Sequence, residues 1–172
     1  FTKNTENFKC GDPSDHSVDM GTLIDKEAAI NVENVVKLAL DEGASLVHGH
    51  ERQGAQYSPT ILDNVNPISR VVSSETFGPV APIMRVKEVS EAIKIITSSE
   101  YRLAGAIMTQ SHAKAKSFAN SIGVGQFNWN GPPGYRTEKA PFGGFGLSGN
   151  GLKEGVVDTV RNYRKVRTFY TH

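Results

Sequence analysis

The sequence lacks the features that mark several broad classes of protein. A single cysteine, Cys10, excludes a disulfide within the chain and fits a reducing compartment, so we expect a cytoplasmic protein. The longest apolar runs are a handful of residues, far short of the roughly 20 that span a bilayer. The 19 basic and 18 acidic side chains leave a formal net charge of +1. This balance gives no strong field for nucleic acid or an anionic membrane, and we expect neither as a partner.

Strand-like and helix-like segments alternate along most of the 172 residues. From Asp25, a candidate N-cap, to Gly43, apolar residues recur at helical spacing and predict a helix. The other predicted helices begin near residue 90 and cover 112–122 and 153–163; the predicted strands cover 45–48, 80–86, 103–108, 124–129 and 165–170. This alternation predicts an α/β fold with a largely parallel sheet flanked by helices.

The segment 130–151 is rich in glycine and proline and carries three aromatic residues, Tyr135, Phe142 and Phe145. A long irregular segment is usually functional or disordered, and the aromatic residues favour function. Residues 144–149 match the pattern G-x-G-x-x-G, but a proline-containing loop precedes them where a dinucleotide site needs a strand. We therefore expect these glycines to allow close backbone packing.

Two further features are weak candidates for a site. His48 and His50 have a spacing that places both on one face of a strand, but no neighbouring set of ligands completes a metal site. Cys10 has no histidine placed by sequence to activate it. We expect loop histidines, a structural cysteine and no metal.

Glu75 and Arg136 each allow two interpretations. Glu75, two residues before Phe77, suits a carboxylate that binds a sugar hydroxyl beside a stacking ring, or else marks a helix end before a core phenylalanine. Arg136 follows a Pro-Gly loop and suits bidentate capture of an anionic group, or else pairs with Glu138.

Several motifs, in order, resemble the aldehyde dehydrogenase superfamily over nearly the whole chain. Asn130 stands at that family's loop-opening asparagine. The other matching segments are Gly11 to Pro13, Met20 to Asp25 (MGTLID), Tyr57 to Val65 (YSPTILDNV), Glu75 to Val80 (ETFGPV), Pro141 to Gly144 (PFGG) and Ser148 to Gly151 (SGNG).

The resemblance implies the C-terminal part of an NAD- or NADP-dependent enzyme that oxidises an aldehyde to a carboxylic acid. In the family a cysteine forms a thioester and a glutamate activates water; both fall upstream of Phe1, so we expect no catalytic residue here and an inactive fragment. Residues 1–150 would be an incomplete catalytic domain, and 151–172 a helix and an oligomerisation strand. The expected partners are the missing N-terminal part and a second copy, in a homodimer or homotetramer.

Five residues match positions with known roles in the family. Glu75 and Phe77 match the residues that hold the nicotinamide ribose and ring, and Phe142 matches an aromatic lining the substrate tunnel. Segments 130–138 and 149–156 are most similar to the phosphonoacetaldehyde and lactaldehyde dehydrogenase branch. There an arginine at Arg136 grips the anionic end of a short aldehyde, with Tyr135 shaping the pocket.

Three sequence differences separate the chain from common members: Gly146 replaces a lysine, Ser74 an acid, and Arg102 a glycine. Two other functions compete with the enzyme fragment. One is a non-catalytic truncated remnant that only dimerises or binds a partner. The other is a free-standing nucleotide-binding module, which predicts NAD affinity in the isolated chain.

Overall fold

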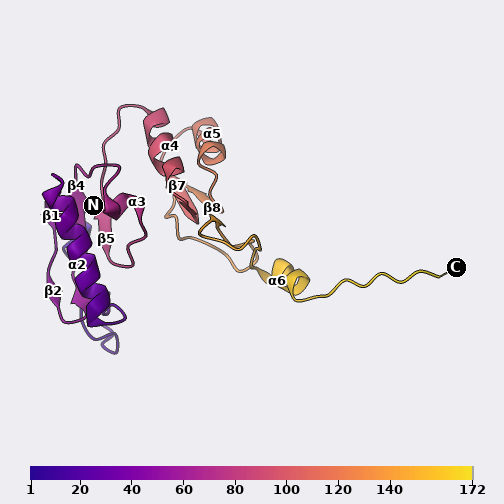
Figure 1. Ribbon diagram of the computed structural model, residues 1–172, viewed down its shortest axis with the longest axis horizontal. Helices are drawn as coiled ribbons and strands as arrows, with labels where there is room; N and C mark the ends of the chain where they lie inside the picture. The colour runs from indigo at the N-terminus through magenta and orange to yellow at the C-terminus, as the bar shows by residue number, and fades with distance from the viewer. Residues whose placement is uncertain (172) are drawn as a thin grey trace. The chain divides into compact units, whose positions relative to one another are not determined.

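The computed structural model describes residues 1–171, which form two compact units, one of residues 1–87 and one from residue 88 onward (Figure 1). The domain boundary expected after residue 150 stays a prediction. Among the described residues, no helix is both long enough and apolar enough to cross a membrane. The α/β fold expected from the sequence is confirmed by helices and strands in both units.

The long helix of the first unit is α2 (Lys26–Asp41). The Asp25 carboxylate caps it by accepting the Ala28 N–H at 2.7 Å, as the sequence predicted. Gly43 follows the helix with φ +102°, a backbone conformation that favours glycine. The two short helices of this unit are α1 (Thr2–Thr5) and α3 (Arg70–Ser73).

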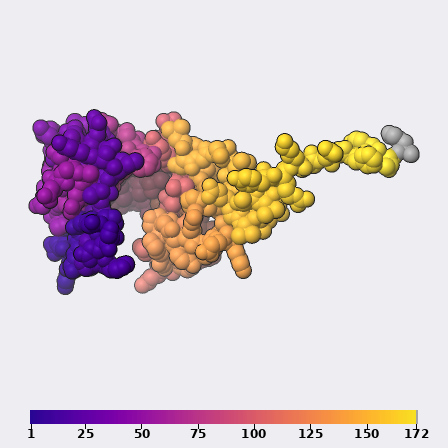
Figure 2. Space-filling view, turned by 90° about the horizontal axis from the view of Figure 1, so that it is seen from below, coloured from indigo at the N-terminus to yellow at the C-terminus, as the bar shows by residue number. Residues whose placement is uncertain are grey.

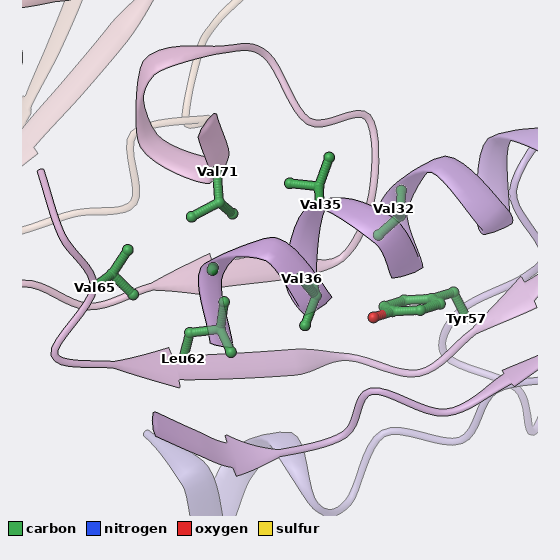
Figure 3. Close-up of a cluster of buried hydrophobic side chains, with 8 residues drawn as sticks. Val32, Val35, Val36, Tyr57, Leu62, Val65 and Val71 are labelled. Atoms are coloured by element: carbon green, nitrogen blue, oxygen red, sulfur yellow. The ribbon is translucent and has the colours of Figure 1, made fainter. Parts of the chain in front are cut away.

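A three-stranded sheet lies against α2, in the order β1 (Ser45–His48), β4 (Thr60–Asp63), β5 (Val80–Pro82). β4 pairs antiparallel with β1 and parallel with β5. Valines of α2 pack on the sheet in one cluster (Figure 3), made of Val32, Val35, Val36, Ala39, Tyr57, Leu62, Val65 and Val71. Burying this cluster orders the first unit.

Three strands of this unit were not expected. The central strand β4 has consecutive buried residues, so it lacks the alternation that marks a strand in sequence. β2 (Arg52–Gln53) and β3 (Gln56–Tyr57) form a hairpin where the sequence indicated a polar loop. The hairpin is joined to α2 by an ion pair of Arg52 with Glu33 at 2.7 Å.

The second unit contains a parallel strand pair, β7 (Ala104–Ile107) with β8 (Gln126–Trp129), joined through α5 (His112–Ile122). Phe118 and Ile122 of α5 are buried, and the Phe118 ring lies 6.2 Å from that of Phe127. α4 (Val89–Ser98) packs on α5. The parallel arrangement and α5 confirm the sequence prediction for this segment.

The glycine-rich segment leads from β8 to the C-terminal helix. β9 (Phe145–Gly146) pairs antiparallel with β6 (Tyr101–Arg102), and α6 covers Val156–Asn162. The strand expected at 165–170 is absent: these residues are exposed and extend away from the body of the second unit (Figures 1 and 2). A strand exists only when its backbone groups pair with a neighbour, and this segment has no neighbour within the described chain.

Candidate functional site

Asn130 directly follows β8 and is the first residue of the irregular segment. Its φ of +55° turns the backbone out of the strand. Its side-chain amide pairs with the backbone of Thr109, as the next residue of a strand would. The amide oxygen accepts the Thr109 N–H at 2.9 Å, and the amide nitrogen donates to the Thr109 carbonyl at 3.0 Å. The end of β8 is thereby joined to the end of β7, which fixes where the loop begins.

The loop after Asn130 is held to β8 by two side-chain amides. The Gln126 amide donates to the carbonyl of Pro133 at 3.0 Å and to that of Tyr135. The Asn128 amide donates to the same two carbonyls, at 3.2 and 3.4 Å. The backbone immediately before Arg136 is therefore fixed by groups that come from a strand.

Arg136 lies against Phe142. The guanidinium carbon stands 4.3 Å from the centre of the Phe142 ring, within the range of a cation–π contact. Phe142 is held in turn by paired backbone hydrogen bonds with Glu154, at 2.7 and 2.6 Å. Both side chains line an open hollow of about 1020 Å³ in the second unit.

Tyr135 is placed differently from these two residues. Its side chain is 62% exposed and does not line that hollow, whereas its carbonyl takes part in the contacts with β8. The structure thus brings together Arg136 and Phe142, and gives Tyr135 a backbone role that the sequence had not indicated.

Lys153 lies beneath the Phe142 segment. Its ammonium donates to the carbonyl of Gly125 at 3.3 Å and to that of Gly143, and it stands 4.5 Å from the centre of the Phe145 ring. One cation therefore joins the start of β8 to the loop that carries Phe142. Hydrogen bonds from a charged donor are stronger than hydrogen bonds between neutral groups.

The glycines at 144–149 are explained by close packing, as expected. A Cβ on Gly149 would overlap the carbonyl oxygen of Gly144, and one on Gly144 would overlap Ser148. Phe145 and Gly146 form β9, where a dinucleotide motif would need the turn between a strand and a helix. The sequence match to a nucleotide fingerprint is therefore fortuitous.

Glu75 and Phe77 lie in the first unit, in the irregular segment between α3 and β5. Gly78 packs against α2 so closely that a Cβ there would stand 2.6 Å from Val32. Pro79 accepts the Thr60 N–H at 2.8 Å. Gly78 and Pro79 thus hold the backbone that follows Phe77. The Phe77 ring is 78% exposed, and the Glu75 carboxylate is exposed as well.

Phe77 also lines a mainly apolar hollow of about 810 Å³ together with Met20, Leu23, Ile24, Thr76 and Pro79. An exposed aromatic ring presents a flat face for stacking. A carboxylate two residues away accepts hydrogen bonds from a pair of hydroxyls. An exposed ring with a carboxylate two residues away is therefore suited to a planar ring that carries a diol.

Of the other sequence candidates, His50 has a structural partner and Cys10 has an unreactive thiol. His50, at φ +70°, places its Nδ1 2.7 Å from the hydroxyl of Tyr57, and burial raises the pKa of Tyr57 to about 12. Partial burial, with Asp19 nearby, raises the pKa of Cys10 and makes its thiolate scarce. Within residues 1–171, no cluster of three or more His, Cys, Asp or Glu side chains suits a metal ion.

Sequence reasoning missed Gln126, Asn128 and Lys153. Only the first two left a signal, which is a pair of polar residues with i, i+2 spacing in a predicted strand. The partners of all three are backbone carbonyls of a distant loop, and backbone acceptors are identical at every residue.

Known proteins resemble the chain along nearly its whole length. The model of the aldehyde dehydrogenase family matches residues 1–169. A lactaldehyde dehydrogenase of Methanococcus maripaludis is 36% identical over 178 residues, covering 100% of this chain and 37% of that protein. A sulfoacetaldehyde dehydrogenase of Neptuniibacter caesariensis is 36% identical over 158 residues, covering 92% of this chain and 34% of that protein.

A solved structure agrees with these matches. A glyceraldehyde-3-phosphate dehydrogenase from Methanocaldococcus jannaschii, complexed with NADP, superposes with a TM-score of 0.87 at 39% identity, over 92% of this chain and 34% of that one. The chain spans about a third of the length of the relatives it matches. The resemblance to the family and to its lactaldehyde dehydrogenase-like branch is thereby confirmed, and the chain belongs to the aldehyde dehydrogenase family.

Proposed function

We propose that the full-length protein oxidises a short, anionic aldehyde to the carboxylic acid with NAD or NADP, and that this chain supplies the group that binds the anion. The observation that carries the proposal is the Arg136 guanidinium, which lies 4.3 Å from the centre of the Phe142 ring in an open hollow. An arginine beside an aromatic wall is suited to hold a planar or tetrahedral anion by two parallel hydrogen bonds.

The nucleotide site of the proposal uses Glu75 and Phe77. Their exposed carboxylate and ring provide a ribose acceptor and a stacking face. When bound, the oxidised nicotinamide accepts a hydride from the substrate carbon. The chain's own contribution is to orient the nicotinamide riboside against an apolar wall. A nicotinamide cofactor is supported by a related solved structure, which is complexed with NADP.

The nucleophilic cysteine and the general-base glutamate belong, in this proposal, to the part of the protein before Phe1. Cys10 is a poor substitute because its pKa is raised by partial burial, and catalytic cysteines need a stabilised thiolate. The chain by itself is therefore proposed to be inactive.

The anionic substrate class is supported by Arg136 and by two relatives. One relative is named for sulfoacetaldehyde and one for glyceraldehyde 3-phosphate, and both compounds pair a short aldehyde with an anionic group. A third is named for lactaldehyde, which is neutral, so neutral short aldehydes are the natural comparison substrates.

We also propose that the full-length protein is a homodimer or homotetramer in which residues 165–170 add a strand to another chain. Large apolar side chains here are almost fully exposed: Val166 at 97%, Phe169 at 84% and Tyr170 at 78%. Exposed apolar side chains on an unpaired extended segment are suited to edge-to-edge pairing.

Replacing Arg136 with alanine in the full-length protein tests the substrate assignment. A charged hydrogen bond contributes about 1.5–3 kcal/mol, so the KM for sulfoacetaldehyde is expected to rise by about 10- to 100-fold. The KM for lactaldehyde should change less than threefold, and Arg136→Lys should restore part of the anion preference as a point charge. Steady-state kinetics with both aldehydes measure the difference. Equal increases of KM for the two aldehydes would overturn the anionic assignment.

A further inference from the structure

We propose that Gln126 and Asn128 are positioning residues that fix the direction of Arg136 and thereby determine the preference for an anionic aldehyde. This inference rests on the proposed function of Arg136. Neither side chain lines the hollow where Arg136 and Phe142 meet, so both act through the backbone of the loop.

The strand β8 brings the two amides to one face. Successive strand residues point to opposite sides, so positions 126 and 128 share a face and Phe127 points the other way. Phe127 packs toward Phe118 of α5, with 6.2 Å between the ring centres. The apolar side of β8 therefore anchors the strand to its unit, and the polar side faces the loop.

The hydrogen bonds form a closed set. Two amide nitrogens carry four hydrogens, and the carbonyl oxygens of Pro133 and Tyr135 carry four lone pairs, so all eight positions are matched by the four observed contacts. A carbonyl accepts and never donates, so only the nitrogen side of each amide can face it. The orientation of both amides is thus set by chemistry.

The Tyr135 carbonyl connects this set to Arg136. That carbonyl belongs to the peptide group that joins Tyr135 to Arg136, and the group is planar. Two donors on its oxygen therefore fix the plane from which the Arg136 Cα projects. The proline ring at Pro133 further limits the loop, because it holds its own φ near −65°.

The guanidinium is restrained at its other end by the Phe142 ring, 4.3 Å away. A side chain restrained at both ends loses little conformational freedom when a ligand binds, which strengthens binding without any added contact. Removing the amides should leave the charge of Arg136 in place but release its direction. The expected loss is therefore one of anion affinity, with the chemical step unaffected.

The test replaces each amide in the full-length protein by a side chain of similar size that cannot donate. The variants are Gln126→Met and Asn128→Leu, singly and together, and each is also made in the Arg136→Ala background. Asn120→Leu is the matched control, since Asn120 is exposed on α5 and takes no part in the loop. Steady-state kinetics use sulfoacetaldehyde and lactaldehyde as the anionic and neutral probes.

We expect each single variant to raise the KM for sulfoacetaldehyde about tenfold, with kcat and the KM for lactaldehyde changed less than twofold. In the Arg136→Ala background the same substitutions should have no further effect on anion preference, because their influence passes through Arg136. Asn120→Leu should match the parent protein with both aldehydes.

Three results would overturn the inference: unchanged KM for sulfoacetaldehyde, equal increases for both aldehydes, or an undiminished effect in the Arg136→Ala background. If the double variant does not fold, the single variants decide, because each leaves one amide donating to both carbonyls. Failure of the proposed function gives a different result, since Arg136→Ala alone would then leave the anion preference intact.

Discussion

Replacing Lys153 with methionine removes an ammonium from between two backbone carbonyls and leaves a side chain of similar length. The carbonyls of Gly125 and Gly143 both accept from this ammonium, at 3.3 Å in the case of Gly125. Glycine is required where these segments meet, because a Cβ on Gly125 would overlap the Gly143 carbonyl oxygen. The two carbonyl dipoles are therefore brought close together, and the cation is what makes that approach favourable.

The size of the effect follows from these contacts. A hydrogen bond to a charged group contributes about 1.5–3 kcal/mol, and Lys153 is only half-buried, so we take about 2 kcal/mol for the pair. This value corresponds to a roughly 30-fold easier local opening of the segment that carries Phe142. The cation–π contact with Phe145 adds to the loss in the same direction.

Amide hydrogen exchange in the full-length protein measures this opening directly. The Phe142 and Glu154 amides report on it, because each donates to the other residue's carbonyl. Both should exchange about 30-fold faster in Lys153→Met, and Lys116→Met, an exposed change on α5, should leave them unaltered. Unchanged exchange in Lys153→Met, or equal acceleration in both variants, would refute the role assigned to the ammonium.

Three further predictions concern other parts of the chain. Gly149→Ala should destabilise the protein by about 3 kcal/mol in chemical denaturation because its Cβ would overlap a backbone carbonyl, whereas Gly131→Ala, with nothing near its Cβ, should be neutral. The side chain of Arg85, together with the Asn64 N–H, lowers the pKa of Asp63 in the folded protein. The stability that this pKa shift contributes is fully present above the ordinary carboxyl pKa, and it is lost as the pH falls through the lowered pKa of Asp63. Below about pH 4, the free energy of unfolding should therefore fall less steeply with decreasing pH in Asp63→Asn than in the parent protein. Phe77→Ala should weaken binding of NAD or NADP to the full-length protein about tenfold by calorimetry, with unchanged affinity refuting its place against the nicotinamide.

The two longest helices were predictable because each carries its own start and stop signals. The Ser111 hydroxyl accepts the Lys114 N–H at 3.3 Å at the start of α5, and Gly123 ends it in the left-handed conformation at φ +54°. Asp25 and Gly43 do the same for α2. Caps and apolar spacing are local properties, so a single sequence is enough to read them.

Elements that depend on distant partners were not predictable to the same degree. β4 is recognisable as a strand only once β1 and β5 pair with its two edges, and the segment 165–170 forms no strand because nothing within residues 1–171 pairs with it. The residues of the candidate site also differ in whether the sequence could predict them. Arg136 and Phe142 were identified through the resemblance, but the amides that hold the loop were found only when the fold placed β8 beside it.

Two of the sequence differences from common family members have structural explanations. Arg102, where a glycine is usual, donates from its guanidinium to the Thr97 carbonyl at 3.3 Å, at the last turn of α4. A cation is favourable at that end of a helix, so the arginine side chain has a structural role at the end of α4. Its backbone N–H donates to the Ser148 hydroxyl at 3.1 Å, which keeps β6 joined to the glycine-rich segment.

The second difference is Gly146, where many family members carry lysine, and it is related to the backbone conformation at this position. Its φ is +57°, and a Cβ there would overlap the carbonyl oxygen of Glu100. A side chain at this position would therefore press on the backbone that pairs β9 with β6.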